Sequence, residues 1–362
     1  MEVTGVTLKN FRNIANADVT LDGGVNIFFG ENAQGKTNFL EAIYVCSTGR
    51  SQRTKYDREL VLFGEKEAHV RLYVKRENNL SDRIDAHIKI SERKGIAVNG
   101  IAVKKSSELF GTLYTVIFSP DDLQLIKSAP SERRKFMDMQ LAQLDPVYCD
   151  ALSQYYRVLK HRNNLLKNIQ KNPSLKETLF AWDSQLVQYG CKLIKERRKF
   201  IEKISDIASL RHKFISDGKE ELSLEYCADI TEEAFEEKLK EATERDIFSG
   251  TTNYGPHRDD IEFVINGSNA RIYGSQGQQR TAALCAKLAQ VDIIESETNQ
   301  KPVLLLDDVL SELDEKRQYF LMDCINDIQT VITCTGIEDT IKKYTGKAKL
   351  FKVEKGNIIH DI

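Results

Sequence analysis

Hydrophobic and polar residues follow two different patterns along the chain. In one, apolar residues stand in short runs that are continuous or alternate with polar residues, which is typical of β-strands. These runs predict strands over 3–8, 17–21, 25–29, 68–74, 85–90, 95–103, 116–118, 222–227, 261–265, 270–273, 303–306, 331–334, 350–353 and 358–360.

The second pattern fills most of residues 121 to 246. Apolar residues recur there three, four and seven positions apart, which predicts helices. We expect them over 131–144, 147–170, 175–215 and 231–246, with a further helix over 278–296. The second and third should form an antiparallel pair, and we interpret the apolar seam from Val187 to Ala208 as packing within the chain rather than as a site for a partner helix.

The order of the two patterns predicts the domain organisation. Strand-rich parts at 1–120 and 247–362 flank the helical part at 121–246. We therefore expect an α/β domain that is split in sequence, with a mainly helical domain inserted into it.

A glycine-rich segment follows the predicted strand at 25–29. Residues 30–37, GENAQGKT, fit the phosphate-binding pattern G-x-x-x-x-G-K-[ST] and stand between a strand and a helix. Gly30 and Gly35 let backbone N–H groups surround phosphate oxygens, Lys36 would reach the β- and γ-phosphates, and Thr37 would ligate Mg²⁺. The alternative is a chance glycine turn, and the flanking strand and helix favour the phosphate loop.

A pair of carboxylates follows a second apolar run. The run 303–306 is fully apolar and predicts a buried strand that delivers Asp307 and Asp308 at its carboxyl end, where ligands bind in open α/β sheets. Asp307 is placed to hold Mg²⁺ and Asp308 to polarise an attacking water. A strand that ends in a solvated turn would look the same, and the phosphate loop on the same chain favours the catalytic interpretation.

A second candidate phosphate cradle precedes the helix predicted over 278–296. Ser275, Gly277 and Gln278 would present a hydroxyl, backbone N–H groups and a helix dipole to an anion. One nucleotide does not need two such cradles from one chain. A two-fold homodimer, in which each cradle faces the nucleotide of the other subunit, is the natural arrangement. Taken alone, the segment could equally be a polar helix cap.

Composition adds limits rather than a function. The 362 residues are 41% hydrophobic and 29% charged, with a net charge of −2, which is ordinary for a globular protein and gives no global signal for nucleic acid. We see no membrane span and no secretory signal. The seven cysteines form no C-x-x-C pair, so we expect small core residues in a reducing cytoplasm rather than disulfides or a zinc site.

Several charged clusters allow two interpretations. The run 255–260, GPHRDD, could be a metal or catalytic cluster, but a turn stabilised by Asp–Arg pairing is the more common explanation. The basic pairs Arg133–Arg134 and Arg197–Arg198 and the loop 50–55 are candidate DNA contacts, although solvated helix faces are more common.

The motifs and their order resemble an ABC-type ATPase head. The chain looks like the SMC group of DNA-repair ATPases and most closely like the RecF family. The resemblance covers the whole chain, and its most specific motif is GPHRDD. It is carried by Lys9–Arg12, Gly30–Thr37, Gly255–Asp260, Ser275–Arg280 and Leu304–Asp314.

The resemblance implies roles for individual residues. Lys36, Asp307 and Asp308 would be catalytic, and Thr37 and Asp307 would hold Mg²⁺. Nucleotide contacts would come from Gly30, Asn32, Gly35, Lys36, Thr37, Asn38 and Arg12, with Ser275, Gly277 and Gln278 acting on the partner's nucleotide. The loop 311–314 would communicate across the dimer. One departure concerns the switch histidine of ABC proteins, because Cys334 and Thr335 stand in that region, and slow hydrolysis is therefore expected.

The resemblance also implies a cellular function. Such a protein would bind ATP and double-stranded or gapped DNA and dimerise around ATP. It would hydrolyse ATP slowly to release the DNA, and it would support RecA loading together with RecR and RecO. The helical insertion would be a shortened counterpart of a coiled-coil arm. Two alternatives are a transporter motor, against which the run 255–260 argues, and a DNA-binding protein whose nucleotide is structural.

Overall fold

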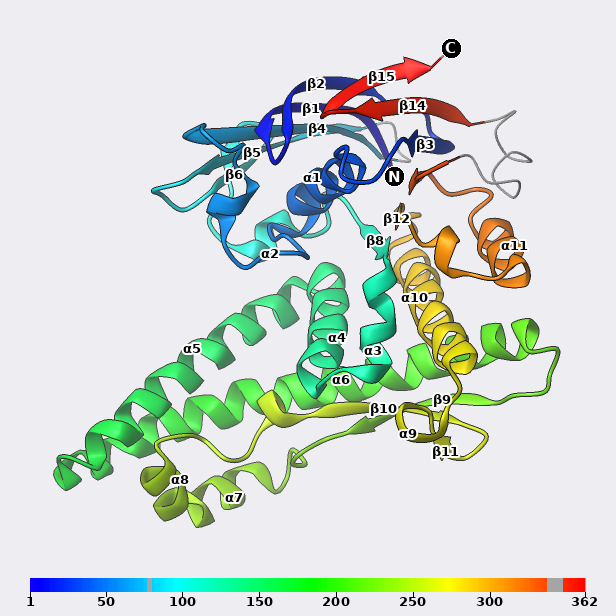
Figure 1. Ribbon diagram of the computed structural model, residues 1–362. Helices are drawn as coiled ribbons and strands as arrows, with labels where there is room; N and C mark the ends of the chain where they lie inside the picture. Colours follow the sequence, from blue (N-terminus) through cyan, green and yellow to red (C-terminus); the bar gives the residue numbers. More distant parts are fainter. Residues whose placement is uncertain (77–79, 337–347, 362) are drawn as a thin grey trace. The chain divides into compact units, whose positions relative to one another are not determined.

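The computed structural model describes residues 1–76, 80–336 and 348–361 (Figure 1). The chain forms two compact units, Met1–Asp122 with Lys287–Ile362, and Leu123–Ala286. The second unit thus includes residues 247–286, which we expected to belong with the strand-rich ATPase domain. The boundary falls inside helix α10 (Gln276–Thr298), so a single helix contributes to both units.

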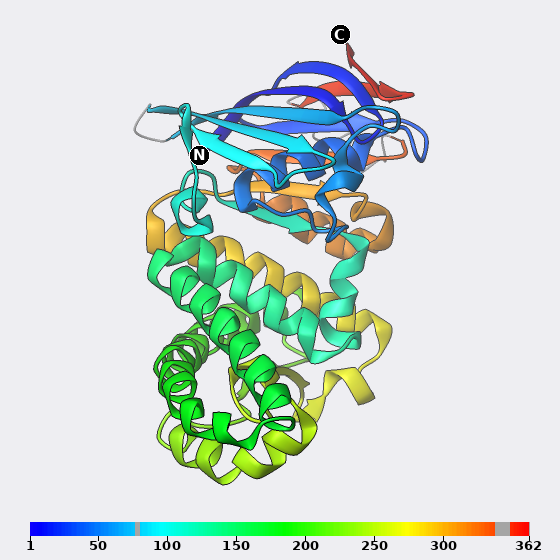
Figure 2. The same cartoon turned by 90° about the vertical axis from the view of Figure 1, so that its left-hand side faces the viewer.

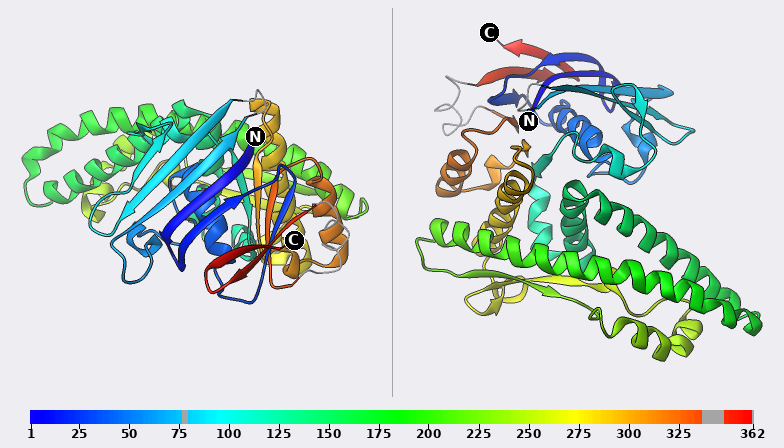
Figure 3. Two further views of the ribbon diagram at one scale, coloured as in Figure 1. Left: turned by 90° about the horizontal axis from the view of Figure 1, so that it is seen from above. Right: turned by 180° about the vertical axis from the view of Figure 1, so that it is seen from behind.

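The first unit contains an antiparallel sheet with the strand order β2-β1-β4-β5-β6-β7 (Figure 3). Alternating positions of its strands are buried, as in β4, where Ala68, Val70, Leu72 and Val74 are buried and the side chains between them face outward. The strands are β1 (Glu2–Phe11), β2 (Ile14–Thr20), β4 (Glu67–Lys75), β5 (Ser81–Lys89), β6 (Gly95–Val98) and β7 (Ile101–Ala102).

The second sheet of this unit has the order β15-β14-β3-β13-β12-β8. Its strands from β14 to β8 are parallel, and β15 is antiparallel to β14. Strands β12 and β13 are buried along their whole length, which explains the continuous apolar run over 303–306 in β12. The strands are β3 (Val25–Phe29), β8 (Thr115–Phe118), β12 (Val303–Asp307), β13 (Thr330–Cys334), β14 (Lys349–Glu354) and β15 (Asn357–Asp361).

Helix α1 (Lys36–Thr48) joins the two sheets of the first unit into one core. It contacts strands of both sheets (Figure 2), and eleven of its thirteen residues are buried. Phe28 of β3 stacks between Phe39 of α1 and Phe351 of β14. The segment between β3 and α1 is therefore anchored at both of its ends in the hydrophobic core of this unit. The other helices here are α2 (Ser106–Leu109) and α11 (Glu315–Cys324), with short 3₁₀ turns at Asp57–Leu60, Pro120–Leu123 and Leu310–Glu312.

The second unit is mainly helical. Helices α5 (Pro146–Ile169) and α6 (Leu179–Ile215) form the expected antiparallel pair (Figures 1 and 3). The seam of α6 packs on α5 and on strand β9 (Leu222–Cys227), which confirms that it serves packing within the chain. The other elements are α3 (Gln124–Lys127), α4 (Pro130–Leu144), α7 (Phe235–Glu241), α8 (Thr243–Ser249), α9 (Ala270–Tyr273), 3₁₀ turns at Pro173–Thr178 and Pro256–Arg258, and a sheet β11-β10-β9 of Ser268–Asn269, Asp260–Ile265 and Leu222–Cys227.

Two predictions of secondary structure were wrong, and some helices were not predicted. Residues 270–273 form a helical turn, α9, rather than a strand, because Oδ1 of Asn269 accepts hydrogen bonds from the N–H groups of Arg271 and Ile272. The helix expected from Thr231 begins only at Phe235 and is divided into α7 and α8. Helix α11 was not predicted. Short segments of this kind carry too little periodicity to separate helix from strand.

None of the seven cysteines is in a disulfide, and Cys46, Cys149, Cys285 and Cys334 are buried as small core residues. No helix among the described residues is both long and apolar enough to cross a membrane.

Candidate nucleotide-binding and hydrolysis site

The loop between β3 and α1 requires its two glycines. Gly30 has φ +153°, and a Cβ atom there would lie 2.4 Å from the carbonyl oxygen of Val353 in β14. Gly35 has φ +116°, and its Cβ would lie 2.7 Å from the side-chain oxygen of Asn13. Any other residue would be strained at both positions. The loop therefore has the backbone shape by which successive N–H groups surround an anion at the start of a helix.

Lys36 lies inside this loop. Its side-chain Nζ donates hydrogen bonds to the carbonyl oxygens of Gly30 at 2.6 Å and Glu31 at 2.7 Å, and the residue is buried. Burial lowers the pKa of Lys36, while the nearby Asp308, Cys334 and Asp307 oppose that shift. The ammonium group is thus positioned within the loop that would hold the phosphates.

Asp307 ends β12 at the carboxyl edge of the parallel sheet. Its Oδ1 accepts hydrogen bonds from Oγ1 of Thr37 at 2.7 Å and from Oγ1 of Thr333 at 2.9 Å. The carboxylate and the Thr37 hydroxyl supply the hard oxygen ligands that Mg²⁺ prefers. These two side chains fit a magnesium ion shared with a bound nucleotide.

Asp308 has an unusual backbone conformation, with φ +52°. Its N–H group donates to the carbonyl oxygen of Thr333 at 3.2 Å and to Oγ1 of Thr333 at 3.0 Å, and its carbonyl oxygen accepts from Oγ of Ser311 at 2.7 Å. Burial raises the pKa of the Asp308 carboxyl group, with Asp307 and Glu312 adding to the shift and Lys36 opposing it. A strained residue with a perturbed carboxyl group is typical of a catalytic position.

A network around the start of α1 was missed by the sequence analysis. Glu41 is fully buried and accepts two hydrogen bonds, each 2.8 Å long, from the guanidinium group of Arg12. Ser51 also donates to Glu41 at 2.5 Å, and Arg53 lies 3.4 Å from it. Arg12 is thereby fixed beside the phosphate-loop helix. The available signal was an acidic residue inside an otherwise apolar helical segment.

Asn38 belongs to the same network, whereas Asn32 does not. The Nδ2 atom of Asn38 donates to Oδ1 of Asn13 at 2.8 Å, and Asn13 in turn donates to the carbonyl oxygen of Gln34 at 3.1 Å. Asn38 therefore braces the loop. Asn32 is exposed at the tip of the loop.

The residues of the second cradle form their own cluster in the second unit. The N–H group of Ser275 donates to Oε1 of Gln278 at 2.8 Å, and the N–H group of Gln278 donates to Oγ of Ser275 at 3.2 Å. This is a reciprocal cap at the start of α10. Gln278 also donates to Glu220 at 2.9 Å, and Gly277 follows on the first turn of the helix. Ser275 is exposed.

The GPHRDD run is a structural turn that holds buried arginines. Arg197 is fully buried and pairs with Asp259 and with Asp138, each at 2.8 Å. Arg133 is buried and makes a two-pronged pair with Asp260, at 2.6 and 2.9 Å. Both interpretations of Arg133 and Arg197, as DNA contacts and as part of a solvated helix face, were therefore wrong, because neither side chain faces the solvent.

The neighbours of these arginines are also engaged. Arg134 donates to the carbonyl oxygen of Asp259 at 2.7 Å, and the half-exposed Arg198 pairs with Glu232 at 3.0 Å. His257 is hydrogen-bonded to the Tyr155 hydroxyl at 2.7 Å, and burial lowers its pKa to about 4. Within the described residues, the GPHRDD run does not form a group of metal ligands.

The comparisons with known proteins agree along the full chain. The RecF/RecN/SMC N-terminal domain family matches residues 2–358. DNA replication and repair protein RecF of Lachnospira eligens is 50% identical over 100% of both chains, and that of Lachnoclostridium phytofermentans is 49% identical over 99% of each.

Solved structures give the same result. The recombination mediator protein RecF-ATP in the RecFOR pathway is 37% identical, with a TM-score of 0.92 over 99% of this chain and 97% of that one. The Smc head domain of Pyrococcus furiosus, 18% identical with a TM-score of 0.58 over 99% of this chain and 95% of that one, shares the fold. Because similarity of sequence and structure extends from end to end, and because the ABC-type head geometry is present in the fold itself, this chain belongs to the RecF family of DNA replication and repair ATPases.

Proposed function

We propose that the chain binds Mg²⁺–ATP in the site formed by residues 30–37 and Asp307 and binds double-stranded DNA in the ATP state. Slow hydrolysis of ATP then releases the DNA. The observation that carries this proposal is the 2.7 Å hydrogen bond between Thr37 and Asp307, which brings the two magnesium-binding groups of an ABC-type head together. The transporter-motor alternative is set aside because the chain belongs to the RecF family.

Slow hydrolysis follows from the residues that surround the γ-phosphate position. Asp308 has a shorter side chain than the glutamate common in ABC ATPases, and its backbone is fixed by Thr333 and Ser311. Its carboxylate would therefore polarise water from farther away. Buried Cys334 ends β13 where a switch histidine is expected, and a thiol is a weaker hydrogen-bond donor than imidazole.

Dimerisation is supported by the exposed cap at Ser275. Its hydroxyl and the first turn of α10 form an anion-binding end of a helix that is 23 residues long. In a two-fold dimer this end would complete the partner's nucleotide site, and ATP would then act as part of the interface. DNA binding in the ATP state would therefore depend on dimerisation as well.

DNA contacts are supported on the first unit, in the loop between α1 and β4. Arg50, Lys55 and Arg58 are exposed there, and the guanidinium of Arg58 lies 5.4 Å from the ring centre of Tyr56, itself 61% exposed. Cationic side chains that alternate with an aromatic ring suit a phosphate backbone. Double-stranded and gapped DNA, with RecR, RecO and RecA in the same cytoplasmic pathway, are the partners we propose, supported by the RecFOR pathway named for the solved relative.

One experiment tests the ATPase and DNA proposals together. Phosphate release and the fluorescence anisotropy of a labelled duplex are measured with ATP and with ADP, for the wild type and for the double variant Lys55→Glu/Arg58→Glu. We expect duplex binding with ATP that is at least tenfold weaker in the variant, and phosphate release that duplex DNA stimulates. Lys75→Glu is the control, because Lys75 is an exposed lysine at the far end of β4 from this loop, where it lies opposite Glu2 in the strand register.

Each outcome bears on a different part of the proposal. Equal duplex binding by the wild type and the double variant would contradict the assignment of the loop. Absence of phosphate release even with DNA would favour the alternative in which the nucleotide is structural. A gapped duplex run in parallel shows whether a junction is preferred.

A further inference from the structure

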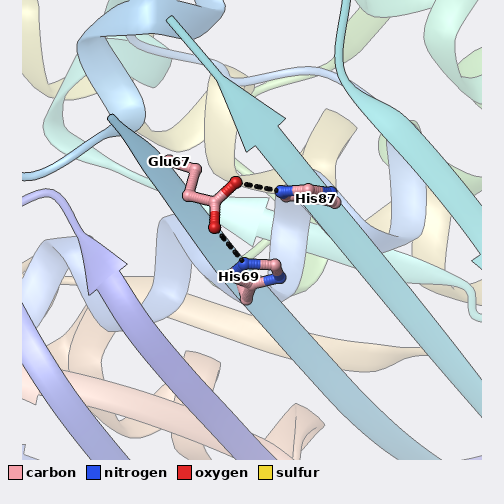
Figure 4. A group of neighbouring side chains, drawn as sticks. All are labelled: Glu67, His69 and His87. Carbon is pink, nitrogen blue, oxygen red and sulfur yellow. Dashed lines mark hydrogen bonds and ion pairs between the residues drawn. The ribbon is translucent and has the colours of Figure 1, made fainter. Parts of the chain in front are cut away.

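Two histidines and a glutamate meet on the outer face of the antiparallel sheet, apart from the nucleotide site. Glu67 and His69 are two residues apart on β4 and so point to the same face, and His87 is the direct cross-strand partner of His69 on β5. Figure 4 shows both imidazole rings turned toward the Glu67 carboxylate. Their side chains are 40% to 49% exposed.

The distances are close to those of a metal site. Oε2 of Glu67 lies 2.9 Å from Nε2 of His87, and Oε1 lies 3.5 Å from Nε2 of His69. In a tetrahedral zinc site with bonds of about 2.1 Å, ligand atoms stand about 3.4 Å apart. One potential ligand atom from each of the three residues lies within 4.8 Å of the others, so small side-chain rotations would complete the geometry.

The chemistry of the donors selects the kind of ion. Two imidazoles and one carboxylate are a donor set of zinc sites, in which water takes the fourth position. Mg²⁺ and Ca²⁺ require mostly oxygen ligands, and only one carboxylate is offered.

The surroundings leave room for an ion, and two neighbouring lysines, Lys9 and Lys89, carry positive charge. Lys89, the partner of Glu67 on β5, pairs with Glu92 at 3.1 Å. Gly95 is the cross-strand partner of His87 on β6 and has no side chain to cover the ring. Arg71 and Asp85, the next pair along the same two strands, form an ion pair at 2.5 Å, and Asp85 also pairs with Arg83 at 2.8 Å. Lys9, the partner of His69 on β1, is exposed, so its flexible ammonium group can turn away into solvent.

We propose that Glu67, His69 and His87 form a surface site for one Zn²⁺-class transition metal ion that bridges strands β4 and β5. The bound ion replaces the hydrogen bonds that now join the carboxylate to the imidazoles. The site is distinct from the Mg²⁺–ATP site, because it lies on the exposed face of the other sheet and uses nitrogen ligands.

Cobalt absorption and zinc dialysis test the site on the full-length chain. Co²⁺ is titrated at pH 7.5 and followed by its visible absorption bands, and Zn²⁺ stoichiometry is measured by equilibrium dialysis. All proteins carry Cys227→Ser, since Cys227 is an exposed thiol that could bind metal itself. We expect one ion per chain, with affinity reduced at least about tenfold in His69→Ala, His87→Ala and Glu67→Gln.

Two controls keep the result interpretable. His161→Ala removes an exposed histidine that stacks on Trp182 in the helical unit, and it should bind metal like the wild type. Nucleotide binding by the His87→Ala variant shows that its first unit is folded. The proposal is overturned if the parent protein binds no Zn²⁺ at micromolar concentrations, or if His69→Ala and His87→Ala bind it as tightly as the parent.

Discussion

Oγ1 of Thr37 donates a hydrogen bond of 2.7 Å to Oδ1 of Asp307, which lies 270 positions later in the chain. This contact joins the first turn of α1 to the end of β12. It places a hydroxyl and a carboxylate where a magnesium ion can use both, with ATP supplying further oxygens.

Removing the hydroxyl should therefore weaken the magnesium-dependent part of ATP binding. We expect Thr37→Val to lower ATP affinity at least about tenfold with Mg²⁺, and to have a much smaller effect in EDTA, because the variant loses an ion ligand and not a phosphate contact. Thr37→Ser keeps the hydroxyl and is the matched control. Titration with a fluorescent ATP analogue measures all three proteins, and an equal loss with and without Mg²⁺ would contradict the assignment.

Substitutions of Lys36 and Asp308 should affect ATP binding and ATP hydrolysis separately. Lys36→Ala removes the charge that the loop holds for the phosphates, so ATP affinity should fall by about tenfold or more. Asp308→Asn leaves the loop intact, so ATP should still bind while phosphate release falls by roughly 10²-fold or more, as expected for loss of a general base. Nucleotide titration and single-turnover phosphate release distinguish the two. Unchanged ATP affinity in Lys36→Ala would count against the phosphate loop.

Ser275→Arg tests the proposed role in the partner's site. The substitution fills the exposed cap of α10 with a long cation while leaving residues 30–37 untouched, so ATP binding should persist and ATP-dependent dimers should be lost. Ser174→Arg, at another exposed serine of the same unit, is the control. Light scattering coupled to size-exclusion chromatography with ATP gives the molecular mass of each variant in solution and so distinguishes monomers from dimers. Dimers that survive in Ser275→Arg would rule out this interface.

The buried position of Arg197 predicts a large effect on stability. Arg197→Met leaves Asp138 and Asp259 as buried charges without their partner and should lower the free energy of unfolding by about 3–5 kcal/mol. Arg198→Met removes a half-exposed pair with Glu232 and should cost less than about 1 kcal/mol. Urea unfolding of the two variants provides the comparison. Equal effects would mean that the GPHRDD turn does not depend on Arg197.

His257 predicts a pH dependence of stability. Its pKa falls from 6.5 to about 4 in the folded protein, so the unfolded chain binds the extra proton between these values. The contribution of neutral His257 to the free energy of unfolding is fully present above pH 6.5. It is lost as the pH falls toward 4, by up to roughly 3 kcal/mol. His257→Gln keeps a hydrogen-bonding group beside Tyr155. It should reduce the dependence of the free energy of unfolding on pH between 4 and 6.5, whereas His161→Gln should not. The same pH slope in all three proteins would contradict this prediction.

Parts of the fold and the site could be predicted because their signals are local. The phosphate loop needs glycines at positions whose φ values are positive, and a lysine and threonine that start a helix, so eight adjacent residues carry it. Strand β12 is buried on both faces and reads as an unbroken apolar run before Asp307. Strand β4 could be predicted from the alternation of apolar and polar residues, because only one of its faces is buried.

Other features could not be predicted, either because the local pattern was weak or because distant residues decide them. Residues 270–273 became a helical turn through the Asn269 cap, which outweighs a weak strand pattern. The role of Glu41 depends on Arg12, 29 positions away. The boundary inside α10 follows from packing, since nothing changes in the sequence of that helix at residue 287.

The sequence by itself determined the ATPase family, the phosphate loop and the carboxylates after β12, because each is written in neighbouring residues whose chemistry requires that order. Only the tertiary structure decided which charges are buried and which are free to act. Arg133 and Arg197 look like surface cations in the sequence, but Asp260 and Asp259, 127 and 62 positions away, hold them inside the protein. Burying a charge is unfavourable unless a partner is brought to it, and in this chain folding brings those partners.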